Sequence, residues 1–386
     1  MDDDAYISEL RQLFPVTRKW NYLYNGGIHP CPLPAAESMR EFIVSWEEGG
    51  RDAWPKARDK FNRLREKFAS LCGGKASNIV ITDSTSSAVN LAAGILNPAP
   101  GSNVVLSDLT FMNNSYAWLA SYPEVEVRFA ENRKGIILPD DIVKLIDKNT
   151  LAVNLCAVTA GNGFRFDLEE VYSLMTESKP PLLVDASQAL GVVPLKVGIP
   201  PVDFLACTAS KWLMGPAGVA FLYVSDRFLD SVPPSAGWYA ASNNREWDVR
   251  KCVLHKDATR FQGGMPNLIG AVGALASLEL IEQVGIEFIE SRVSDLVSYA
   301  LSGLKKLDLE IHTPENPGQR AGLIFFKHPK AEKLYNTLHS AGIYCGCFKG
   351  GIRIDPNFYN TFEEIDQLLS VVRNFTNAEN TAGIKA

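Results

Sequence analysis

The sequence predicts an α/β protein with a mostly parallel sheet domain and a smaller C-terminal α+β domain. From Asn78 onward, short apolar runs alternate with amphipathic stretches over about 150 residues, as in parallel sheets that are covered on both faces. After Pro266, long helical stretches replace this alternation. The length of 386 residues suits roughly two domains. We expect a large domain at 21–270 and a small domain at 271–386, with residues 1–20 packing on the small one.

Each expected element follows from its local pattern. Residues 35–72 are predicted to be helical because apolar side chains such as Phe61, Leu64 and Phe68 recur at helical spacing. The strands expected in the large domain are 79–81, 104–106, 151–155, 182–184, 204–208 and 219–224. The helices expected between them are 84–96, 113–120 and 167–175, the last capped by Asp167. The small domain is expected to contain helices at 267–307, broken near Gly285, and at 361–375, with strands at 322–327 and 351–354.

Composition and charge exclude several classes of protein. The chain is 46% hydrophobic and 21% charged, which is ordinary for a globular protein, and its net charge of −6 favours neither nucleic acid nor an anionic membrane as a partner. No apolar run approaches the roughly 20 residues of a membrane span. The start Met1-Asp2-Asp3-Asp4 is the opposite of a basic signal peptide. We therefore expect a cytoplasmic protein without nucleic-acid or membrane partners.

The seven cysteines do not suggest a disulfide framework or a metal site. They are scattered and odd in number, and only Cys345 and Cys347 are close together. Without a second pair, these two make a poor zinc site. We expect reduced thiols, several of them buried, and no bound metal.

Two residues at the ends of apolar runs indicate the chemistry. Asp185 ends one expected strand, and Lys211 follows another, 211 − 185 = 26 residues later. In α/β sheets, ligands bind beyond the carboxyl ends of the strands, so this carboxylate and this amine can converge. Pyridoxal phosphate requires such a pair. The lysine forms a Schiff base with the cofactor aldehyde, and the aspartate keeps the ring nitrogen protonated, so that the ring withdraws electrons from the substrate Cα.

Hydroxyl residues provide candidate phosphate ligands. Thr85 and Ser86 lie where a strand gives way to a helix, and free N–H groups at a helix start bind phosphate without a lysine. Thr208 and Ser210, just before Lys211, could complete the phosphate site. The alternative is a helix start with more capping groups than it needs.

Other candidates follow neighbouring strands. Phe111 could stack on a pyridine ring, although a core phenylalanine fits this stretch equally well. Thr159 and Asn162 could hydrogen-bond the cofactor hydroxyl or a substrate group, but simple turn formation also explains an Asn162-Gly163 pair. Gln188, three residues after Asp185, could reach the phenolic oxygen.

Two further residues are candidates for substrate binding. Arg353 stands in an apolar strand beside glycines, and a guanidinium binds a carboxylate through two parallel hydrogen bonds. An internal pair with an aspartate or glutamate is the alternative. His29, in a glycine-containing loop, is weaker, because most lone loop histidines are structural.

Seven motifs follow one another along the chain, at residues 22–27, 82–88, 184–188, 210–218, 236–238, 260–266 and 352–361. In this order and spacing they resemble the class V aminotransferase family of fold-type-I pyridoxal-phosphate enzymes, nearly end to end. That family also contains cysteine desulfurases, cysteine/cystine C–S lyases, kynureninases and isopenicillin N epimerase-like proteins. The resemblance implies a seven-stranded, mostly parallel sheet and a pyridoxal 5'-phosphate cofactor.

The resemblance also implies roles for matching residues. Lys211 would be the Schiff-base lysine, Asp185 the partner of the ring nitrogen, and Arg353 the anchor of the substrate α-carboxylate. The remaining cofactor contacts would be Thr85, Ser86, Thr208 and Ser210 around the phosphate, Gln188 near the phenolic oxygen, and Phe111 on the ring.

Family members are dimers, so the resemblance implies a homodimer with its active site at the interface. The partner subunit would lend a segment equivalent to 263–266, including Gly264, to the phosphate. Trp238 matches a tryptophan that kynureninase-like members place near the same phosphate. Met265 replaces a hydroxyl residue that is common in this segment, which puts that hydrogen bond in doubt.

Three departures bear on the subclass. Cysteine desulfurases usually have histidine at the positions of Phe111 and Ser210. They also carry a persulfide-accepting cysteine well before the carboxylate-binding arginine. Here Cys345 and Cys347 precede Arg353 by only 353 − 345 = 8 and 353 − 347 = 6 residues. These departures disfavour a desulfurase and favour the kynureninase, epimerase and C–S lyase side of the family.

The sequence therefore predicts an enzyme that acts at Cα and Cβ of an amino acid, with β-elimination ranked first. Transamination, epimerisation, kynureninase-like β,γ-cleavage and decarboxylation-linked oxidative deamination are the alternatives. A nicotinamide dehydrogenase is disfavoured because no Gly-x-Gly-x-x-Gly follows a strand. A cofactor-less binding protein on the same fold is the non-enzymatic alternative.

Overall fold

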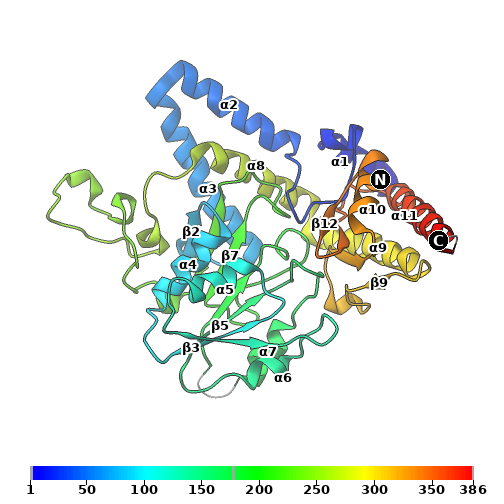
Figure 1. The fold of residues 1–386 in the computed structure, drawn as a ribbon. Helices are drawn as coiled ribbons and strands as arrows, with labels where there is room; N and C mark the ends of the chain where they lie inside the picture. The colour runs from blue at the N-terminus through cyan, green and yellow to red at the C-terminus, as the bar shows by residue number, and fades with distance from the viewer. Residues whose placement is uncertain (1–2, 176–178, 385–386) are drawn as a thin grey trace.

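A seven-stranded sheet forms the centre of the molecule in this computed structural model, which describes residues 3–175 and 179–384 (Figure 1). The strand order is β2-β8-β7-β6-β5-β3-β4, and every neighbouring pair is parallel except the two that β8 makes. The strands are β2 (Ile79–Thr82), β3 (Asn103–Ser107), β4 (Glu126–Ala130), β5 (Thr150–Cys156), β6 (Leu182–Asp185), β7 (Phe204–Thr208) and β8 (Ala220–Val224). The predicted mostly parallel sheet is confirmed.

The sheet is buried on both faces, which is why its central strands are continuous apolar runs. Successive residues of a strand point to opposite faces. Val104 and Val105 of β3 accordingly enter two different hydrophobic clusters, as do Phe204 and Leu205 of β7. The helices around this sheet are α2 (Leu33–Gly49), α3 (Trp54–Cys72), α4 (Thr85–Ile95), α5 (Met112–Leu119), α6 (Pro139–Val143), α7 (Leu168–Leu174) and α8 (Leu268–Val284).

Different helices cover the two faces. Side chains of α4 and α5 join one cluster, whereas side chains of α3, α7 and α8 join the other. Helices α2 and α3 both pack on α8, and Figure 1 shows α2 extending away from the sheet. The long segment between β8 and α8 also projects from the body of the molecule.

The C-terminal unit is built around a second, antiparallel sheet in the order β12-β13-β10-β9. Its elements are α9 (Ile286–Lys305), β9 (Glu310–Ile311), β10 (Ile324–Lys327), α10 (Ala331–Ser340), β11 (Ile343–Tyr344), β12 (Gly346–Phe348), β13 (Gly351–Ile354) and α11 (Phe362–Ile384). This unit is the expected smaller α+β domain. Nothing tests the division at residue 270, which stays a prediction.

The N-terminal segment lies against this unit. It contains α1 (Asp3–Gln12) and β1 (Asn21–Tyr22), and β1 pairs in parallel with β11. Arg11 forms a two-bond ion pair with Glu364 and also donates to the Tyr359 carbonyl. The Phe14 ring stacks on the Tyr359 ring at 4.1 Å between centroids.

Sequence and structure differ at several element boundaries. The helical region 35–72 is two helices interrupted at Gly50, and the closing helix continues to Ile384 instead of ending near residue 375. β4 was not predicted, because an edge strand with the sequence Glu-Val-Arg-Phe-Ala lacks the apolar run of a central strand.

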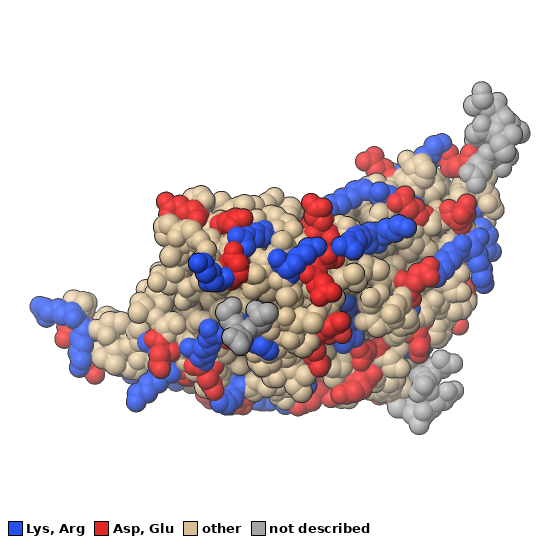
Figure 2. Space-filling view, turned by 90° about the horizontal axis from the view of Figure 1, so that it is seen from below, with Lys and Arg blue, Asp and Glu red and all other residues tan. Residues whose placement is uncertain are grey.

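No single helix among the described residues is long and apolar enough to cross a membrane. Helices α8 and α9 reach that length only as a pair, and the pair is bent by 80°. On the face shown in Figure 2, basic and acidic side chains are interspersed.

We predict that Phe68→Ala lowers the free energy of unfolding by about 3–5 kcal/mol, the usual result of emptying a buried phenylalanine site. Phe68 is fully buried, and its ring stacks on that of Phe221 at 4.0 Å. Chemical denaturation measures the change. Phe129→Ala, on the exposed side of β4, is the matched control and should cost less than about 1 kcal/mol. Equal losses for the two variants would contradict the assignment of Phe68 to the core.

Candidate active site

Lys211 lies just beyond the carboxyl end of β7, which ends at Thr208. Its amine lies 5.3 Å from the centroid of the Phe111 ring, which projects from the start of α5. Burial lowers the pKa of Lys211; nearby Asp185 opposes this effect, and Arg353 adds to it. No hydrogen bond to the Lys211 amine occurs among the described residues. A lysine with a lowered pKa has a larger neutral fraction, which is the form that acts as a nucleophile or base.

Asp185 is the last residue of β6 and is buried. One carboxylate oxygen accepts a hydrogen bond from the Ser187 backbone N–H at 2.9 Å, and the other accepts one from Asn114 Nδ2 at 3.0 Å. The carboxylate is therefore held in a fixed orientation at the carboxyl edge of the sheet. It lies near enough to Lys211 to act on the pKa of the amine.

Asn114 was missed by the sequence analysis. It is fully buried, and its Nδ2 also lies 3.3 Å from Cys156 Sγ, while its Oδ1 is buried without a hydrogen-bond partner. The available signal was position: Asn114 and Trp118 are four residues apart on α5 and share its buried face. A polar side chain on such a face requires a buried partner, and here the partner is Asp185.

Hydroxyl groups gather near the start of α4. Thr85 and Ser187 bond each other at 2.9 Å, and Thr208 and Ser210 do so at 3.0 Å. The first N–H groups of a helix have no intrahelical acceptor. Ser84 caps only the N–H of Ser87, which leaves the N–H groups of Thr85 and Ser86 available for an anion.

Arg353 lies in β13 and is buried against Asp355. Its Nε and Nη2 face the Asp355 carboxylate at 2.8–2.9 Å, and Nη1 donates to the Ala160 carbonyl at 3.2 Å. The internal pair considered from the sequence is therefore present. The pair occupies one side of the guanidinium. Nη2 is buried without a hydrogen-bond partner among the described residues, and Nη1 keeps one hydrogen, so that the end of the fork can still bind a second carboxylate.

A glycine turn lies between Arg353 and the large sheet. Gln188 donates to the Gly26 carbonyl at 2.8 Å and accepts from the Trp212 indole at 2.8 Å. A Cβ at Gly26 would come within 2.7 Å of both Arg353 Nη2 and Gln188 Oε1. Only glycine allows this close approach. The Tyr24 ring, in the same turn, lies 5.5 Å from the Arg353 guanidinium.

Thr159 and Asn162 form a buried turn. Thr159 donates to Asn162 Oδ1 at 2.6 Å, and the Asn162 amide donates to the carbonyls of Gly135 and His312. These bonds match the turn-forming alternative. The predicted contacts of both residues with cofactor or substrate stay predictions.

His29 is also held by structural contacts. Its ring is buried between the Pro30 carbonyl, which accepts from Nδ1 at 2.7 Å, and the Asn357 amide, which donates to Nε2 at 2.8 Å. Burial lowers its pKa to about 4. A neutral histidine with both ring nitrogens engaged fits a structural role better than the predicted substrate contact. Its backbone N–H donates to Ser210, beside Lys211.

Trp238 and Gly264 lie next to each other on the projecting segment between β8 and α8. A Cβ at Gly264 would be 3.9 Å from the Trp238 indole nitrogen, and Trp238 is 55% exposed. Among the described residues, no hydrogen bond or ring contact joins this pair to Lys211 or Thr85. Their predicted cofactor contacts stay predictions.

The described residues fit pyridoxal phosphate. The Lys211 amine suits the aldehyde of the cofactor, and the available N–H groups at the start of α4 suit its phosphate. The Asp185 carboxylate suits a protonated ring nitrogen. The described residues contain no group of three or more His, Cys, Asp or Glu side chains arranged to hold a metal ion.

Comparison with known proteins identifies the family. The model of the class V aminotransferase family matches residues 22–368. The chain belongs to this family. It is thus a pyridoxal-phosphate-dependent class V enzyme, and the cofactor-less binding protein is set aside.

Three similar proteins span three activities within this family. The chain is 25% identical to the cysteine desulfurase of Thermococcus onnurineus NA1, whose apo structure covers 96% of this chain and 98% of that one with a TM-score of 0.88. It is 24% identical to a kynureninase of Bacillus thuringiensis subsp. konkukian (strain 97-27), over 91% of this chain and 87% of that protein. It is 22% identical to the cystine C–S lyase C-DES in complex with cysteine persulfide, with a TM-score of 0.85 over 92% of this chain and 98% of that one.

We predict that Asn114→Ala weakens cofactor binding by about 10- to 100-fold, since a buried hydrogen bond to a charged group contributes about 1.5–3 kcal/mol. Absorbance titration of the apoenzyme with pyridoxal phosphate measures this. Asn154→Ala is the matched control, because Asn154 is equally buried but bonds Trp118 and a backbone carbonyl. An unchanged dissociation constant in Asn114→Ala would contradict the role given to this amide.

We predict that His29→Gln reduces the acid sensitivity of folding. Because the pKa of His29 is lowered from 6.5 to about 4, the unfolded chain binds a proton in this window that the folded chain does not. Stability therefore falls as pH drops from 6.5 to 4, by about 3 kcal/mol in total at this residue. Urea unfolding at several pH values measures the slope. An unchanged slope in His29→Gln would refute the prediction.

Proposed function

We propose that this class V enzyme eliminates a sulfur-bearing group from Cβ of an amino acid, as a C–S lyase does. The overall reaction would convert R–S–CH₂–CH(NH₃⁺)–COO⁻ and water into R–SH, pyruvate and ammonium. The observation that carries the catalytic part of the proposal is the Lys211 amine, which has a lowered pKa and no described hydrogen bond and shares its surroundings with Asp185, Phe111 and Arg353.

The residues have distinct tasks in this proposal. When bound, pyridoxal phosphate supplies an aldehyde that condenses with amines and a ring that withdraws electrons from the substrate Cα. Asp185, oriented by Asn114 and Ser187, would hold the proton on the ring nitrogen. Phe111 would pack against the ring.

Arg353 would orient the substrate. Its end-on fork binds the α-carboxylate, while Asp355 fixes the guanidinium and balances its charge. Because Asp355 is fully buried and reaches only the side of Arg353, it does not compete for the end of the fork. The Gly26 turn lies over this end and would exclude water from the bound carboxylate.

Lys211 would move the proton. Its neutral amine takes the proton from the substrate Cα, and the bond from Cβ to sulfur then breaks with sulfur keeping the electron pair. Burial lowers the pKa of Lys211 and so increases the neutral fraction at physiological pH.

The cysteines support elimination over sulfur transfer to the protein. Gly346 is paired with Arg353, so these residues share one face of the small sheet, and Cys347, paired with Ile352, points to the opposite face. Cys345 is buried, and burial raises the pKa of its thiol to about 12. These two thiols are thus poorly suited to accept sulfur from a substrate on Arg353. The likeness to C-DES agrees with a lyase.

Cysteine desulfurase is the second candidate, and the Thermococcus relative favours it. Cys31 and Cys252 are exposed and would be the thiols to test as sulfur acceptors. Transamination, epimerisation, kynureninase-like cleavage and decarboxylation-linked oxidation are kept as outcomes of the substrate test below.

We further propose that the enzyme is a cytoplasmic homodimer. All seven cysteines are free, as in a reducing compartment. Exposed apolar side chains gather on α2 and on the projecting segment before α8, and exposed apolar patches often mark protein interfaces. They include Ile43, Val44, Trp46, Trp238, Trp247 and Val249.

We predict that Lys211→Ala abolishes the absorbance of lysine-bound cofactor and lowers turnover by at least about 10³-fold, since both the covalent attachment and the base are removed. Spectra and steady-state rates measure this. Lys75→Ala, at an exposed lysine paired with Asp226, should leave both unchanged. Retained colour and activity in Lys211→Ala would falsify the catalytic assignment.

A substrate panel tests the reaction subtype. We predict that L-cysteine, L-cystine and S-methylcysteine yield pyruvate and a thiol, persulfide or sulfide, with equal rates in wild type and in the double variant Cys31→Ala, Cys252→Ala. Loss of sulfur release in the double variant would favour the desulfurase. No spectral change with these substrates, together with turnover of another amino acid, would reject the lyase.

We predict a mass near twice 42.4 kDa in sedimentation experiments. Trp46→Glu should shift the protein toward the monomer, because it places a charge in the proposed interface. Leu174→Glu, at an exposed apolar position on α7, is the control. A monomeric wild-type chain at micromolar concentration would contradict the proposal.

A further inference from the structure

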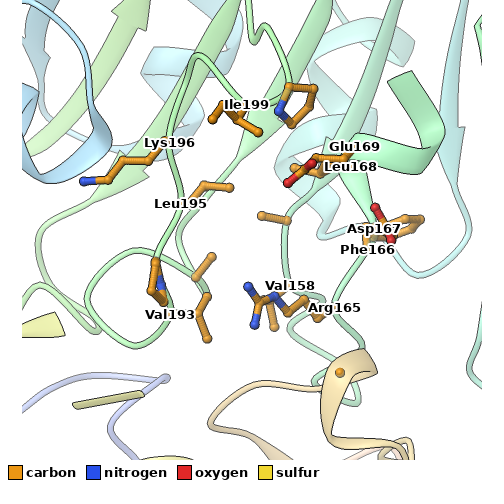
Figure 3. Close-up of a pocket in the computed structure, with 15 residues that line it drawn as sticks. Val158, Arg165, Phe166, Asp167, Leu168, Glu169, Val193, Leu195, Lys196 and Ile199 are labelled. Atoms are coloured by element: carbon orange, nitrogen blue, oxygen red, sulfur yellow. The ribbon is translucent and has the colours of Figure 1, made fainter. Parts of the chain in front are cut away.

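A hollow of about 540 Å³ lies outside the proposed catalytic site, in the large domain and bordered by Gly318 of the C-terminal unit. Its walls come from residues 157–169, residues 189–200 and Gly318. Ligand sites commonly have volumes of about 300–1,000 Å³ and occur at domain interfaces. Figure 3 shows Arg165 and Glu169 directed into this hollow from the same stretch of chain, while Lys196 points away from it.

A smaller hollow of about 40 Å³ adjoins the first, and the two share Arg165 and Val193. It adds Arg320, Glu290 and Ser294 to the lining. We call the two together the interdomain cavity. Its larger part has an apolar portion, formed among others by Val158, Phe166, Leu168, Val193, Leu195 and Ile199, and is also lined by Arg165, Asp167, Glu169 and Lys196. Two arginines, Arg165 and Arg320, line its smaller part.

Arg320 is the unusual residue of this cavity. It is only 7% exposed, and its guanidinium donates to the carbonyls of Pro314 and Glu315 and to the Ser298 hydroxyl. Among the described residues, no carboxylate bonds it. A buried charge normally has a partner of opposite sign, because neutral acceptors replace only part of its lost hydration. Burial lowers the pKa of Arg320, and the nearby Glu315 carboxylate offsets this effect only in part.

Arg165 provides a second cation and links the two domains. Its Nη1 forms an ion pair with Glu290 of α9 at 3.0 Å, and its backbone N–H donates to the Gln319 carbonyl. The pair is about one-third exposed on each side, so Arg165 can exchange Glu290 for another anion at little cost.

We propose that the interdomain cavity binds a small carboxylic acid with an apolar body, the carboxylate at Arg320 and Arg165 and the body in the larger hollow. An acid without an amino group fits better than an amino acid. Glu290, Asp167 and Glu169 also line the cavity. Glu290 is paired with Arg165, and Asp167 accepts from the Glu170 N–H, so neither is available to an amino group.

The bound acid would act on the catalytic site through the turn between them. Ala157, Val158, Arg165 and Phe166 line the cavity, and the turn between Val158 and Arg165 carries the Ala160 carbonyl, which accepts from Arg353. The same stretch is bonded to the C-terminal unit, since Ala321 donates to the Gly163 carbonyl. An acid that contacts both domains favours the arrangement in which Arg353 reaches Ala160. It should therefore lower the KM of the amino-acid substrate, and substrate should in turn tighten binding of the acid.

Calorimetric titration of the holoenzyme with 4-methylpentanoate tests the site. The titration is done in an Arg353→Met background, so that the proposed substrate anchor cannot bind the acid. We expect saturable binding of one acid per chain. Arg165→Met and Arg320→Met should each weaken it by at least about tenfold, as loss of a charge-assisted hydrogen bond does. Glu290→Gln should tighten binding, because it frees Arg165, and Arg227→Met on the surface is the matched control.

Leu195→Trp provides a second test that leaves both arginines in place, should Arg320→Met fail to fold. The indole would fill the larger hollow and should abolish binding. The proposal is overturned if the Arg353→Met enzyme does not bind the acid. It is also overturned if binding persists after both Arg165→Met and Leu195→Trp are introduced separately into that background. If saturating acid leaves the KM of the amino-acid substrate unchanged in the wild-type enzyme, the proposed effect of the acid on the catalytic site is wrong. Because the main readout is heat of binding, these results do not depend on which reaction the enzyme catalyses.

Discussion

Lys211 and Asp185 lie at the carboxyl edge of the large sheet, and Arg353, from β13 of the small sheet, lies near enough to act on the pKa of Lys211. The desolvation of Lys211 is the constraint on which the site depends, because burial penalises its charged form and nearby Asp185 only partly offsets this penalty. Such an arrangement is costly to folding unless each charge is held by surrounding bonds. Asn114 provides such a bond to Asp185, and Asp355 provides them to Arg353.

Two connections hold this edge against the C-terminal unit. The Gly26 turn is bonded to Gln188 of the large domain, while its neighbour Asn25 donates to the carbonyl of Asp355 in the small one. The turn at 159–164 of the large domain also bonds the small one: the Ala160 carbonyl accepts from Arg353, and the Asn162 amide donates to the His312 carbonyl. In the proposed mode of binding, with the substrate between Lys211 and Arg353, the site depends on both turns. The interdomain cavity lies behind the second of them.

Local patterns predicted much of this architecture. The buried strands were predictable because both faces of a parallel sheet are covered, and this leaves continuous apolar runs such as 204–208. Lys211 and Asp185 could be chosen because the carboxyl ends of such strands meet at one edge. Edge strand β4 and the two- and three-residue strands β9, β11 and β12 of the C-terminal unit lacked this signal. For Trp238 and Gly264, nothing in the described chain tests the predicted cofactor contact, which the family places across a subunit interface.

The sequence by itself determined the family and the buried strands of the large sheet, and it pointed to Lys211 and Asp185 as candidates, because these depend on periodicity and on motifs that are local in the chain. Only the tertiary structure decided how other polar residues are used. Arg353 pairs with Asp355 through one side of its guanidinium, and the end of the guanidinium is left for a second carboxylate. The ring of His29 is bonded to Pro30 and Asn357, and Asn114 donates to Asp185. Each of these outcomes depends on which polar groups meet after the chain has folded. Sequence spacing does not specify those meetings, because the partners lie up to 328 residues apart.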